Sequence, residues 1–299
     1  MPRIDYGDGL VINAPEGMTV LEASIQHGIH HIHACGGQCK CTTCRAEILE
    51  GLENCPAMSQ SEREALTLAG FNHQTVRLAC QLRPKGDIKV RLLLRDHAPL
   101  RPEGMARERE VAVLFADLRG FTAFAERHMP FDVLHLLNRY FDRMGTIVDT
   151  HNGYVITFLG DGIICLFEAG EARWRVQSAT RCGLQMLDAS EIFAQYTRDH
   201  FGFDLRMGVG IAWGRAVIGQ VGYYNKSGLN IVGDVVNTAA RVQEATKEVG
   251  VRLLVTEGVQ QLTKGMFQIG KEFTLALKGK EGQQRLYEIL AEQQPSKQK

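Results

Sequence analysis

The sequence lacks an excess of charge of either sign, since it has 34 lysines and arginines against 34 aspartates and glutamates. No net field attracts nucleic acid or an anionic membrane, and we expect neither as a partner. It also lacks any apolar run near the roughly 18 residues of a membrane span. The polar start MPRIDYGDG has no apolar core typical of a signal peptide. We therefore expect a cytoplasmic protein of 299 residues, long enough for two modest domains.

Structural disulfides are not expected in a reducing compartment, so the eight cysteines are better candidates for metal ligands, redox chemistry or core packing. Within the segment HACGGQCKCTTCR, Cys35, Cys41 and Cys44 form the pattern C-x5-C-x2-C, and Cys80 follows in RLACQL. Three thiolates on one tight loop and a remote fourth can close a four-ligand site around a soft metal. The two glycines after Cys35 favour a sharp bend that presents backbone N–H groups to the sulfurs.

The loop ACGGQCKCTTCR followed by RLACQ resembles a 2Fe-2S ferredoxin domain of the β-grasp fold, over residues 1 to about 94. Its spacing differs from the plant-type C-x4-C-x2-C and is closer to adrenodoxin-like loops. The resemblance implies a 2Fe-2S cluster held by Cys35, Cys41, Cys44 and Cys80, with Cys39 as an extra, non-ligating thiol. A zinc site is the alternative, although zinc ribbons generally use two C-x2-C pairs and only one is present here.

The other cysteines and the nearby histidines favour plainer interpretations. Isolated cysteines in apolar patterns are usually core residues, which we expect for Cys55, Cys165 and Cys182. Because four cysteines already supply a complete ligand set, we expect solvated or hydrogen-bonding roles for His27, His30, His31 and His33.

The charged segment RDHAPLRPEGMARERE, with two prolines and no apolar period, predicts a linker between two units. We expect a first domain over 1–94, a linker over 95–107, a second domain over 108–291 and a polar tail over 292–299. The first is a small α+β unit with short alternating runs at 10–12, 19–20 and 87–93 and a helix over 21–27.

The second unit alternates helices with strands that pair as hairpins. Its pattern predicts a strand in VAVLFADL, a helix from Pro130 to Asn152, and a hairpin in YVITFLGDGIICLF. It then predicts a helix over 172–193, a hairpin within LRMGVGIAWGRAVIGQVG, a helix over 235–249, a strand in VRLLVT and closing strands to Ile289.

Two aspartates stand at strand ends of this unit, Asp117 in FADLRGFT and Asp161 in the hairpin tip FLGDGI. Two carboxylates brought together by adjacent strands could hold two magnesium ions about 3.5–4 Å apart, which suits a nucleoside triphosphate. Asn237 and Arg241 lie four residues apart, on one helical face, and arginine suits a phosphoryl group whose charge grows during reaction. Taken alone, a loop aspartate is usually a turn former and Arg241 a surface ion-pair partner.

Together FADLRGFT, FLGDGI, GQVGYYNKSGLNIVGDVVNTAAR and LKGK resemble the class III nucleotidyl cyclase catalytic domain, from about Glu108 to Leu290. The resemblance implies a ferredoxin-like, βαββαβ-type α+β domain that works as a homodimer with shared active sites. By matching positions it makes Asp117 and Asp161 ligands of two Mg²⁺ or Mn²⁺ ions. Asn237 would orient the ribose and Arg241 would stabilise the transition state, both from the other subunit.

Three further positions carry substrate roles by the same resemblance. Lys278 matches the triphosphate-binding lysine, although Lys280 could also serve. The purine-reading positions hold Thr157 and Asn230 instead of the residues usual in the family. Both side chains can donate and accept hydrogen bonds, so neither dictates adenine over guanine.

The resemblance implies an adenylate cyclase that converts ATP to 3′,5′-cyclic AMP and diphosphate, with ATP favoured by its frequency as substrate in the family, and the fusion of the two units suggests regulation by the cluster. GTP as substrate is an alternative. A second alternative is an electron-transfer ferredoxin with a non-catalytic cyclase-like dimerisation module. A cluster with a purely structural role is a third, and the cluster leaves room for a redox partner.

Overall fold

The computed structural model describes residues 1–7, 9–71, 74–94, 106–223, 226–280 and 282–293. The chain divides into two compact units, Met1–Arg107 and Glu108–Lys299, which are described separately. Most of the expected linker (95–107) and of the expected polar tail (292–299) lies outside the described residues.

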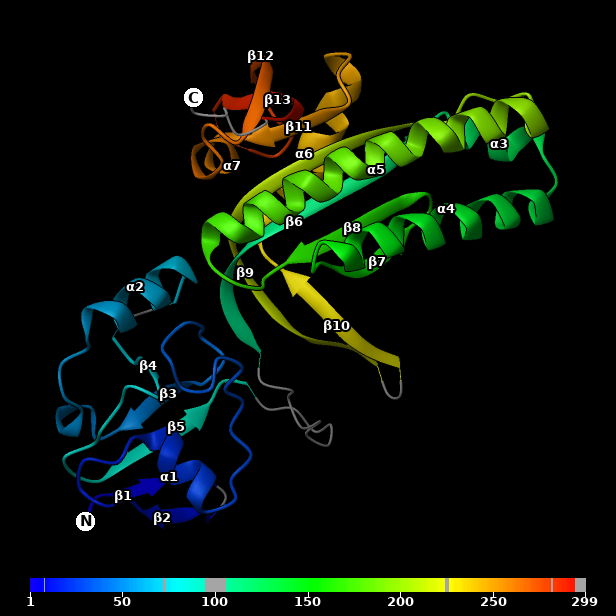
Figure 1. The fold of residues 1–299 in the computed structure, drawn as a ribbon. Coiled ribbons are helices and arrows are strands. Elements are labelled where there is room, and N and C mark those ends of the chain that lie inside the picture. The colour runs from blue at the N-terminus through cyan, green and yellow to red at the C-terminus, as the bar shows by residue number, and fades with distance from the viewer. Residues whose placement is uncertain (8, 72–73, 95–105, 224–225, 281, 294–299) are drawn as a thin grey trace. The chain divides into compact units, whose positions relative to one another are not determined.

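The first unit is a five-stranded sheet with the order β2-β1-β5-β3-β4 and two short helices (Figure 1). Its strands are β1 (Arg3–Asp5), β2 (Val11–Asn13), β3 (Arg45–Glu50), β4 (Val76–Leu78) and β5 (Ile88–Leu92). Its helices are α1 (Val20–Gln26), α2 (Gln60–Leu68) and the 3-10 helix Leu52–Asn54. The pair β1–β5 is parallel and the others are antiparallel, so the sheet is mixed.

Helix α1 begins where the sequence suggested a short extended run at 19–20. Thr19 is its N-cap, with its side chain accepting the Glu22 N–H at 3.1 Å and the Glu22 carboxylate accepting the Thr19 N–H at 2.8 Å. Such a capping box satisfies two N–H groups that have no partner inside the helix. The extended expectation was therefore wrong for Val20, whereas Thr19 does have extended backbone.

Helix α2, which the sequence analysis missed, is fixed to the sheet by a buried ion pair. The Glu62 carboxylate accepts bonds from Arg77 Nε at 3.0 Å and Nη2 at 3.0 Å, and from the Leu78 N–H at 2.7 Å. The two charged side chains are 1% and 6% exposed. Strand β4, which leads directly to Cys80, is thereby attached to α2.

The second unit is an eight-stranded sheet with the order β12-β13-β11-β9-β6-β8-β7, and β10 pairs with β9 (Figure 1). The strands are β6 (Arg107–Arg119), β7 (Tyr154–Leu159), β8 (Gly162–Phe167), β9 (Arg206–Tyr223), β10 (Lys226–Val232), β11 (Leu253–Thr256), β12 (Phe267–Leu275) and β13 (Gln284–Glu292). The helices are α3 (Phe121–Arg127), α4 (Pro130–Thr150), α5 (Ala172–Phe201), α6 (Asp234–Glu248) and α7 (Glu257–Leu262).

Alternate side chains of β6 enter two different cores, because successive residues of a strand point to opposite faces. One core, with α4 and α5, receives Ala112, Leu114, Ala116 and Leu118. The other, with α6, receives Val111 and Val113, and Phe115 packs against it. By this alternation Asp117 belongs to the face of the sheet that α6 covers.

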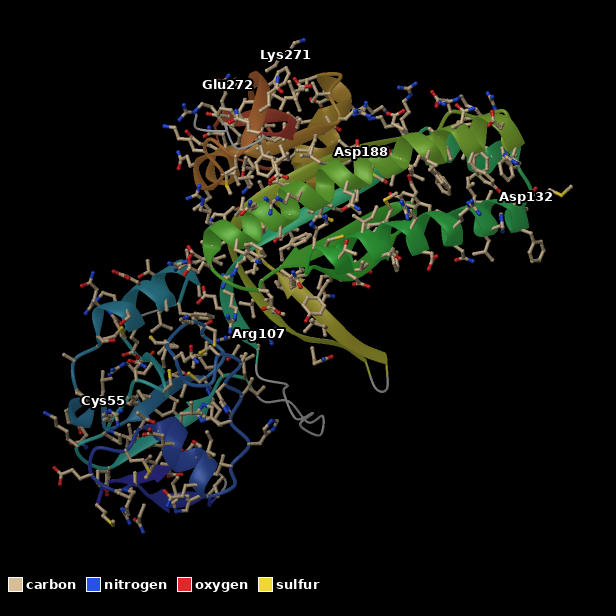
Figure 2. The ribbon with its side chains drawn as sticks, viewed as in Figure 1. Cys55, Arg107, Asp132, Asp188, Lys271 and Glu272 are labelled. Atoms are coloured by element: carbon tan, nitrogen blue, oxygen red, sulfur yellow. The ribbon has the colours of Figure 1, made fainter. Side chains whose placement is uncertain are left out.

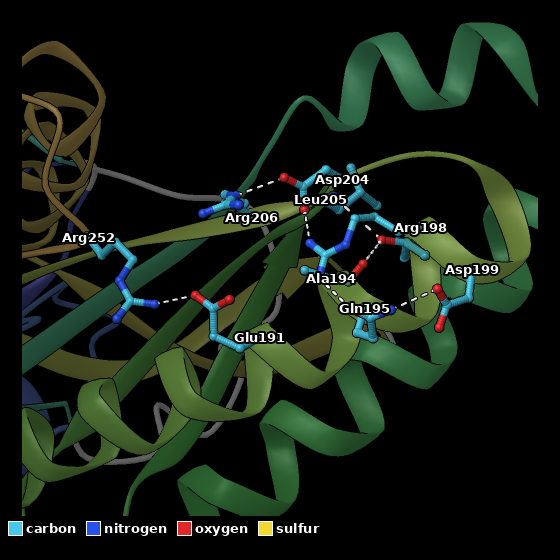
Figure 3. Close-up of polar contacts among 10 residues, drawn as sticks. Glu191, Ala194, Gln195, Arg198, Asp199, Asp204, Leu205, Arg206 and Arg252 are labelled. Carbon is cyan, nitrogen blue, oxygen red and sulfur yellow. Dashed lines mark hydrogen bonds and ion pairs between the residues drawn. The ribbon is translucent and has the colours of Figure 1, made fainter.

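Two predicted elements differ from the structure. The segment expected to form a hairpin within 205–222 is the single strand β9, and its antiparallel partner is the following strand β10. Helix α5 is eight residues longer than expected and ends at Gly202, whose φ of 64° terminates it. In Figure 3, Asp204 accepts bonds from Arg198 Nη1 at 2.5 Å and Arg206 Nε at 2.8 Å where α5 leads into β9.

No helix in the described part of the chain combines the length and the apolar character needed to cross a membrane.

Candidate functional sites

The cysteine loop lies between α1 and β3, and Cys80 follows the end of β4. The four predicted ligands come together as two pairs. Cys35 and Cys41 lie next to each other, and so do Cys44 and Cys80. The first pair is half-buried and the second is buried, with Cys44 1% and Cys80 8% exposed.

Backbone N–H groups surround the sulfurs, as a cluster-binding loop requires. Lys40 and Gln38 donate to the Cys35 sulfur, and Cys39 donates to the Cys80 sulfur. The loop can wrap in this way because Gly36 and Gly37 have φ angles of 65° and 82°.

This arrangement fits a two-iron cluster better than a single metal ion. In a 2Fe-2S cluster each iron takes two of the four thiolates, so two separate pairs are the geometry required. A structural zinc site instead needs four ligands around one point. Cys35 and Cys41 would hold one iron, and Cys44 and Cys80 the other.

The remaining cysteines take no part in these pairs. Cys39 is half-buried at φ 58°, and burial raises the pKa of its thiol to about 11. Cys55, labelled in Figure 2, follows the 3-10 helix, and its thiol donates to the Gly51 carbonyl at 3.7 Å. Cys165 and Cys182 are fully buried in the core of the second unit, which confirms the core prediction for these two residues.

The neighbouring histidines make hydrogen bonds to other groups. Nδ1 of His27 is 3.0 Å from the Ala23 carbonyl, and Nδ1 of His33 is 2.6 Å from the His31 carbonyl. His31 is 3% exposed, and burial lowers its pKa to about 4, so its imidazole is neutral. The Nε2 atom of His30 is buried without a partner among the described residues.

The two aspartates predicted to bind metal meet at one end of the large sheet. Asp117 is near the end of β6 and Asp161 is in the two-residue turn between β7 and β8, and their side chains are hydrogen-bonded to each other. The Leu118 N–H also donates to Asp161 Oδ2 at 3.2 Å. Gly162 permits this approach, because a Cβ there would lie 3.4 Å from Asp117 Oδ1 and 3.2 Å from the Leu159 carbonyl.

The pair holds more negative charge than its surroundings neutralise. Burial, followed by the charge of Asp161, raises the pKa of the Asp117 carboxyl to about 7. Burial also raises the pKa of Asp161. Tyr140 of α4 is fully buried in the core on the other face of the sheet, and its hydroxyl has no hydrogen-bond partner in the described residues. The charges of both aspartates contribute, after burial, to a raised pKa of Tyr140.

These observations fit a site for hard divalent cations. Mg²⁺ commonly binds through one or two carboxylates and completes its shell with water and substrate phosphates. Two adjacent carboxylates that share a proton when no cation is bound supply that donor set. Asp117 and Asp161 would therefore hold Mg²⁺ or Mn²⁺.

Asn237 and Arg241 both lie on α6, but no hydrogen bond or ion pair of the described residues joins them to the aspartates. Nη1 of Arg241 instead donates to both carboxylate oxygens of Glu244, at 2.9 and 2.7 Å. Glu244, which the sequence analysis missed, is also near enough for its charge to raise the pKa of Asp117 slightly. Its spacing of three residues from Arg241 on a helix was the available signal.

The two candidate triphosphate lysines differ in environment. Lys280 forms an ion pair with Asp234, the first residue of α6, and lines a surface hollow of about 560 Å³. Thr238 of the next helical turn, Trp213 and Arg215 line the same hollow. Lys278 precedes Gly279 in the turn between β12 and β13 and does not line the hollow.

The two purine-reading candidates lie on strands that contact each other, β7 and β10. Thr157 follows an irregularity in the β7–β8 pairing, and Oγ1 donates to the Phe158 carbonyl at 3.4 Å. Asn230 pairs with Gly219 across β10–β9, and its side-chain oxygen accepts the Ile231 N–H at 2.8 Å. Both side chains thus make only weak or local bonds within the chain.

Comparison with known families identifies two segments. Residues 104–291 match the family described as the adenylate and guanylate cyclase catalytic domain, and residues 4–85 match the 2Fe-2S iron-sulfur cluster binding domain. The expected β-grasp ferredoxin and class III cyclase folds are thereby confirmed.

Curated relatives agree with this assignment. The chain is 30% identical over 207 residues to an adenylate cyclase of Anabaena cylindrica, covering 63% of this chain and 38% of the relative. It is 31% identical over 186 residues to adenylate cyclase 1 of Rhizobium meliloti (strain 1021), covering 62% and 28%. The chain therefore spans well under half the length of these relatives.

Two solved structures share the fold of the second unit. The guanylyl cyclase Cya2 is 26% identical with a TM-score of 0.59, covering 64% of this chain and 97% of that one. The adenylyl cyclase CyaB from P. aeruginosa, at 23% identity and a TM-score of 0.58, covers 62% and 95% and shows the fold alone.

Proposed function

The chain belongs to the adenylate and guanylate cyclase family, and from this premise we propose that it converts ATP to 3′,5′-cyclic AMP and diphosphate. The observation that carries the proposal is the half-buried pair of adjacent carboxylates, Asp117 and Asp161, at the end of β6. Such a pair of unneutralised carboxylates is what a metal-dependent phosphoryl reaction needs.

Bound divalent cations would lower the pKa of the ribose 3′-hydroxyl and neutralise charge on the phosphates. The chain's own groups provide positioning and electrostatic stabilisation. The carboxylates of Asp117 and Asp161 fix the cations at the rigid end of a central strand. The 3′ oxygen attacks the α-phosphorus and passes its proton to water, and the bond from that phosphorus to the diphosphate breaks, so that diphosphate leaves.

We propose that Asn237 and Arg241 reach this site from a second copy of the chain. In one chain Arg241 is paired with Glu244, and α6 places neither residue in bonding contact with the aspartates. In the homodimer Asn237 orients the ribose and Arg241 stabilises the charge on the transferring phosphoryl group. Lys278 binds the triphosphate. Lys280 is paired with Asp234 and lies at the N-terminal end of α6.

Exposed apolar side chains support pairing with a second copy. Strand β7 is an edge of the sheet, and its exposed residues include Tyr154, Phe158 and Leu159. Strands β9 and β10, which contact β7 through β10, expose Val217, Val221, Leu229 and Val232. Exposed apolar side chains on neighbouring strands are typical of a protein interface.

The choice of ATP over GTP rests on the adenylate cyclases among the relatives. Thr157 and Asn230 can serve either base, because each offers a donor and an acceptor. GTP is the alternative that the likeness to a guanylyl cyclase structure favours. The two nucleotides must therefore be tested side by side.

We further propose that a 2Fe-2S cluster on Cys35, Cys41, Cys44 and Cys80 regulates the reaction. The two cysteine pairs with their N–H donors support cluster binding. An active site shared between two protomers is sensitive to small displacements of one protomer relative to the other. A change in cluster charge that causes such a displacement would therefore change the rate of catalysis. The cytoplasm is the compartment in which such a reducible site would operate.

The test is product formation by the anaerobically purified full chain. Cyclic nucleotide is measured from ATP and from GTP with Mn²⁺, with the cluster oxidised and then reduced. A redox-dependent rate that disappears in Cys80→Ser but persists in Cys55→Ser, a cysteine outside the loop, supports the proposal. Equal rates would make the cluster structural, and no product from either nucleotide would favour the electron-carrier alternative.

A further inference from the structure

Four buried residues connect the first strand to the cysteine loop through a continuous series of hydrogen bonds. Oη of Tyr6 is 2.7 Å from Ser24 Oγ, which is 2.9 Å from His31 Nδ1. Nε2 of His31 is 3.2 Å from the Cys44 carbonyl oxygen. The exposed fractions of Tyr6, Ser24, His31 and Cys44 are 4%, 0%, 3% and 1%.

The partners determine where each proton lies. A carbonyl oxygen can only accept, so His31 Nε2 carries the proton and donates to Cys44. Nδ1 of the neutral imidazole must then accept, and the donor is the Ser24 hydroxyl. Ser24 Oγ also donates to the Val20 carbonyl at 2.7 Å, so its single proton is shared between that oxygen and His31 Nδ1. Tyr6 in turn donates to Ser24, so every bond in the series points toward the cysteine loop.

The Cys44 carbonyl is the point where the loop meets the segment that carries Cys80. It accepts a second bond from the Ala79 N–H at 3.1 Å. The Ala79 carbonyl accepts the Leu21 N–H at 3.0 Å, which ties the same segment to α1. His31 therefore bonds to the carbonyl that links the cysteine loop to the segment of Cys80. This link sets the separation of Cys44 and Cys80.

We propose that His31 is a positioning residue for the cluster, which holds the buried Cys44–Cys80 pair at the separation that one iron requires. This inference rests on the proposed cluster and is independent of the cyclase reaction. Groups that orient metal ligands affect affinity although they do not touch the metal, and their loss typically costs on the order of 10- to 100-fold. The Nε2–H donor, rather than the bulk of the ring, is the feature required.

The experiment compares variants of the full chain carrying its cluster. His31→Leu removes the donor, His31→Gln keeps an N–H at the position of Nε2, and His27→Leu is the matched control. His27 bonds only the Ala23 carbonyl of its own helix. The loss of visible cluster absorption is followed in the presence of an iron chelator, and the reduced cluster is examined by electron paramagnetic resonance.

We expect His31→Leu to lose its cluster on the order of tenfold faster than the unchanged chain and to show altered resonance g values. His31→Gln should restore most of the retention, and His27→Leu should match the unchanged chain. If His31 were purely structural, its loss would leave the resonance spectrum of the remaining cluster unchanged. Glutamine at position 31 would then not restore cluster retention.

Equal retention in all variants, or equal loss in His31→Leu and His31→Gln, would overturn the proposal. If His31→Leu does not fold, Ser24→Ala replaces it, because it removes the donor to Nδ1 with a smaller change in side-chain volume, although Tyr6 also loses its bond to Ser24. Retention must then fall in Ser24→Ala, and an unchanged rate would contradict the inference. All readouts concern the cluster, so failure here is distinguishable from failure of the cyclase proposal.

Discussion

Two inactive variants should restore each other's activity if each active site draws on two chains. Asp117→Asn removes a carboxylate of the metal pair, and Arg241→Ala removes the cation proposed to stabilise the transition state. Removal of one group that stabilises developing charge typically lowers kcat on the order of 10²–10³-fold. Each variant alone should therefore be nearly silent.

The recovered activity follows from the symmetry of a homodimer. After equal mixing with free exchange of subunits, about half of the dimers contain one chain of each kind. Each mixed dimer has one site with both Asp117 and Arg241 intact and one site with both changed. The mixture should therefore reach about a quarter of the unchanged activity, and mixed dimers isolated through two different tags about half.

The assay is cyclic nucleotide formed from ATP with Mn²⁺ after coexpression of the two differently tagged variants. The matched control mixes Asp117→Asn with Asp161→Asn. Those residues come from the same chain, so every site in that mixture keeps at least one defect and activity should not return. No recovery in the first mixture, or equal recovery in both, would refute sites shared between chains.

Three further outcomes are expected. Glu62→Gln leaves the Arg77 charge buried without its partner and should lower the unfolding free energy of the first unit by roughly 3–5 kcal/mol, and calorimetry showing no loss would contradict this. The pKa of Asp117 is raised from its ordinary value of 3.8 to about 7, so the stability of the metal-free chain falls as pH rises between those values. Asp117→Asn should therefore unfold at a higher temperature than the unchanged, metal-free chain at pH 8 and show no such gain near pH 4. Gly162→Ala places a Cβ 3.4 Å from the Asp117 carboxylate and should lower kcat with little loss of stability, whereas Gly145→Ala, with open space around it, should leave kcat unchanged.

The residues that carry chemistry were easier to predict than the elements that hold them. Cysteine spacing and the aspartates at strand ends are local patterns, and the structure brings together both the cysteine pairs and Asp117 with Asp161. The pairing of Asn237 and Arg241 with the aspartates is not present in one chain, so the roles assigned to them stay predictions. The spacing of Asn237 and Arg241 along one helix does not show how far they lie from residues of another subunit.

The long strand β9 was misread because its glycines resemble turn signals. In the structure they serve close packing instead. A Cβ at Gly210 would lie 2.2 Å from the Gln243 backbone nitrogen, so glycine lets α6 approach the strand. A single sequence contains no sign of which helix lies over which strand, and this tertiary contact therefore could not be foreseen.

The short helices α2, α3 and α7 were also missed, for a related reason. Helices of six to nine residues show barely two turns of apolar period. Their stability comes from contacts such as the buried Glu62–Arg77 pair, which links residues fifteen positions apart. The hydrogen bonds of His31 were likewise anticipated only in kind, since its partners Ser24 and Cys44 are brought near by the fold.

The position of β6 limits how the cluster could influence catalysis. This strand begins at Arg107, where the expected linker ends, and reaches Asp117 within the same strand. It lies between β9 and β8 in the sheet, and Ala112 to Ala116 pair with β8. A strand that is hydrogen-bonded on both sides resists bending. A displacement at Arg107 would therefore move the sheet of that protomer as a whole and leave the geometry at Asp117 unchanged.

Redox control should therefore act on the relation between the two protomers. A Gly-Ser insertion within residues 95–105 should then leave the rate of one redox state nearly unchanged and abolish the difference between oxidised and reduced forms, because a flexible linker transmits little displacement. Metal affinity of the Asp117–Asp161 pair, measured by Mn²⁺ titration, should be the same in both redox states and in the insertion variant. A redox-dependent Mn²⁺ affinity in the unchanged chain would show that the signal reaches the carboxylates directly, and the argument from the rigidity of β6 would then be wrong.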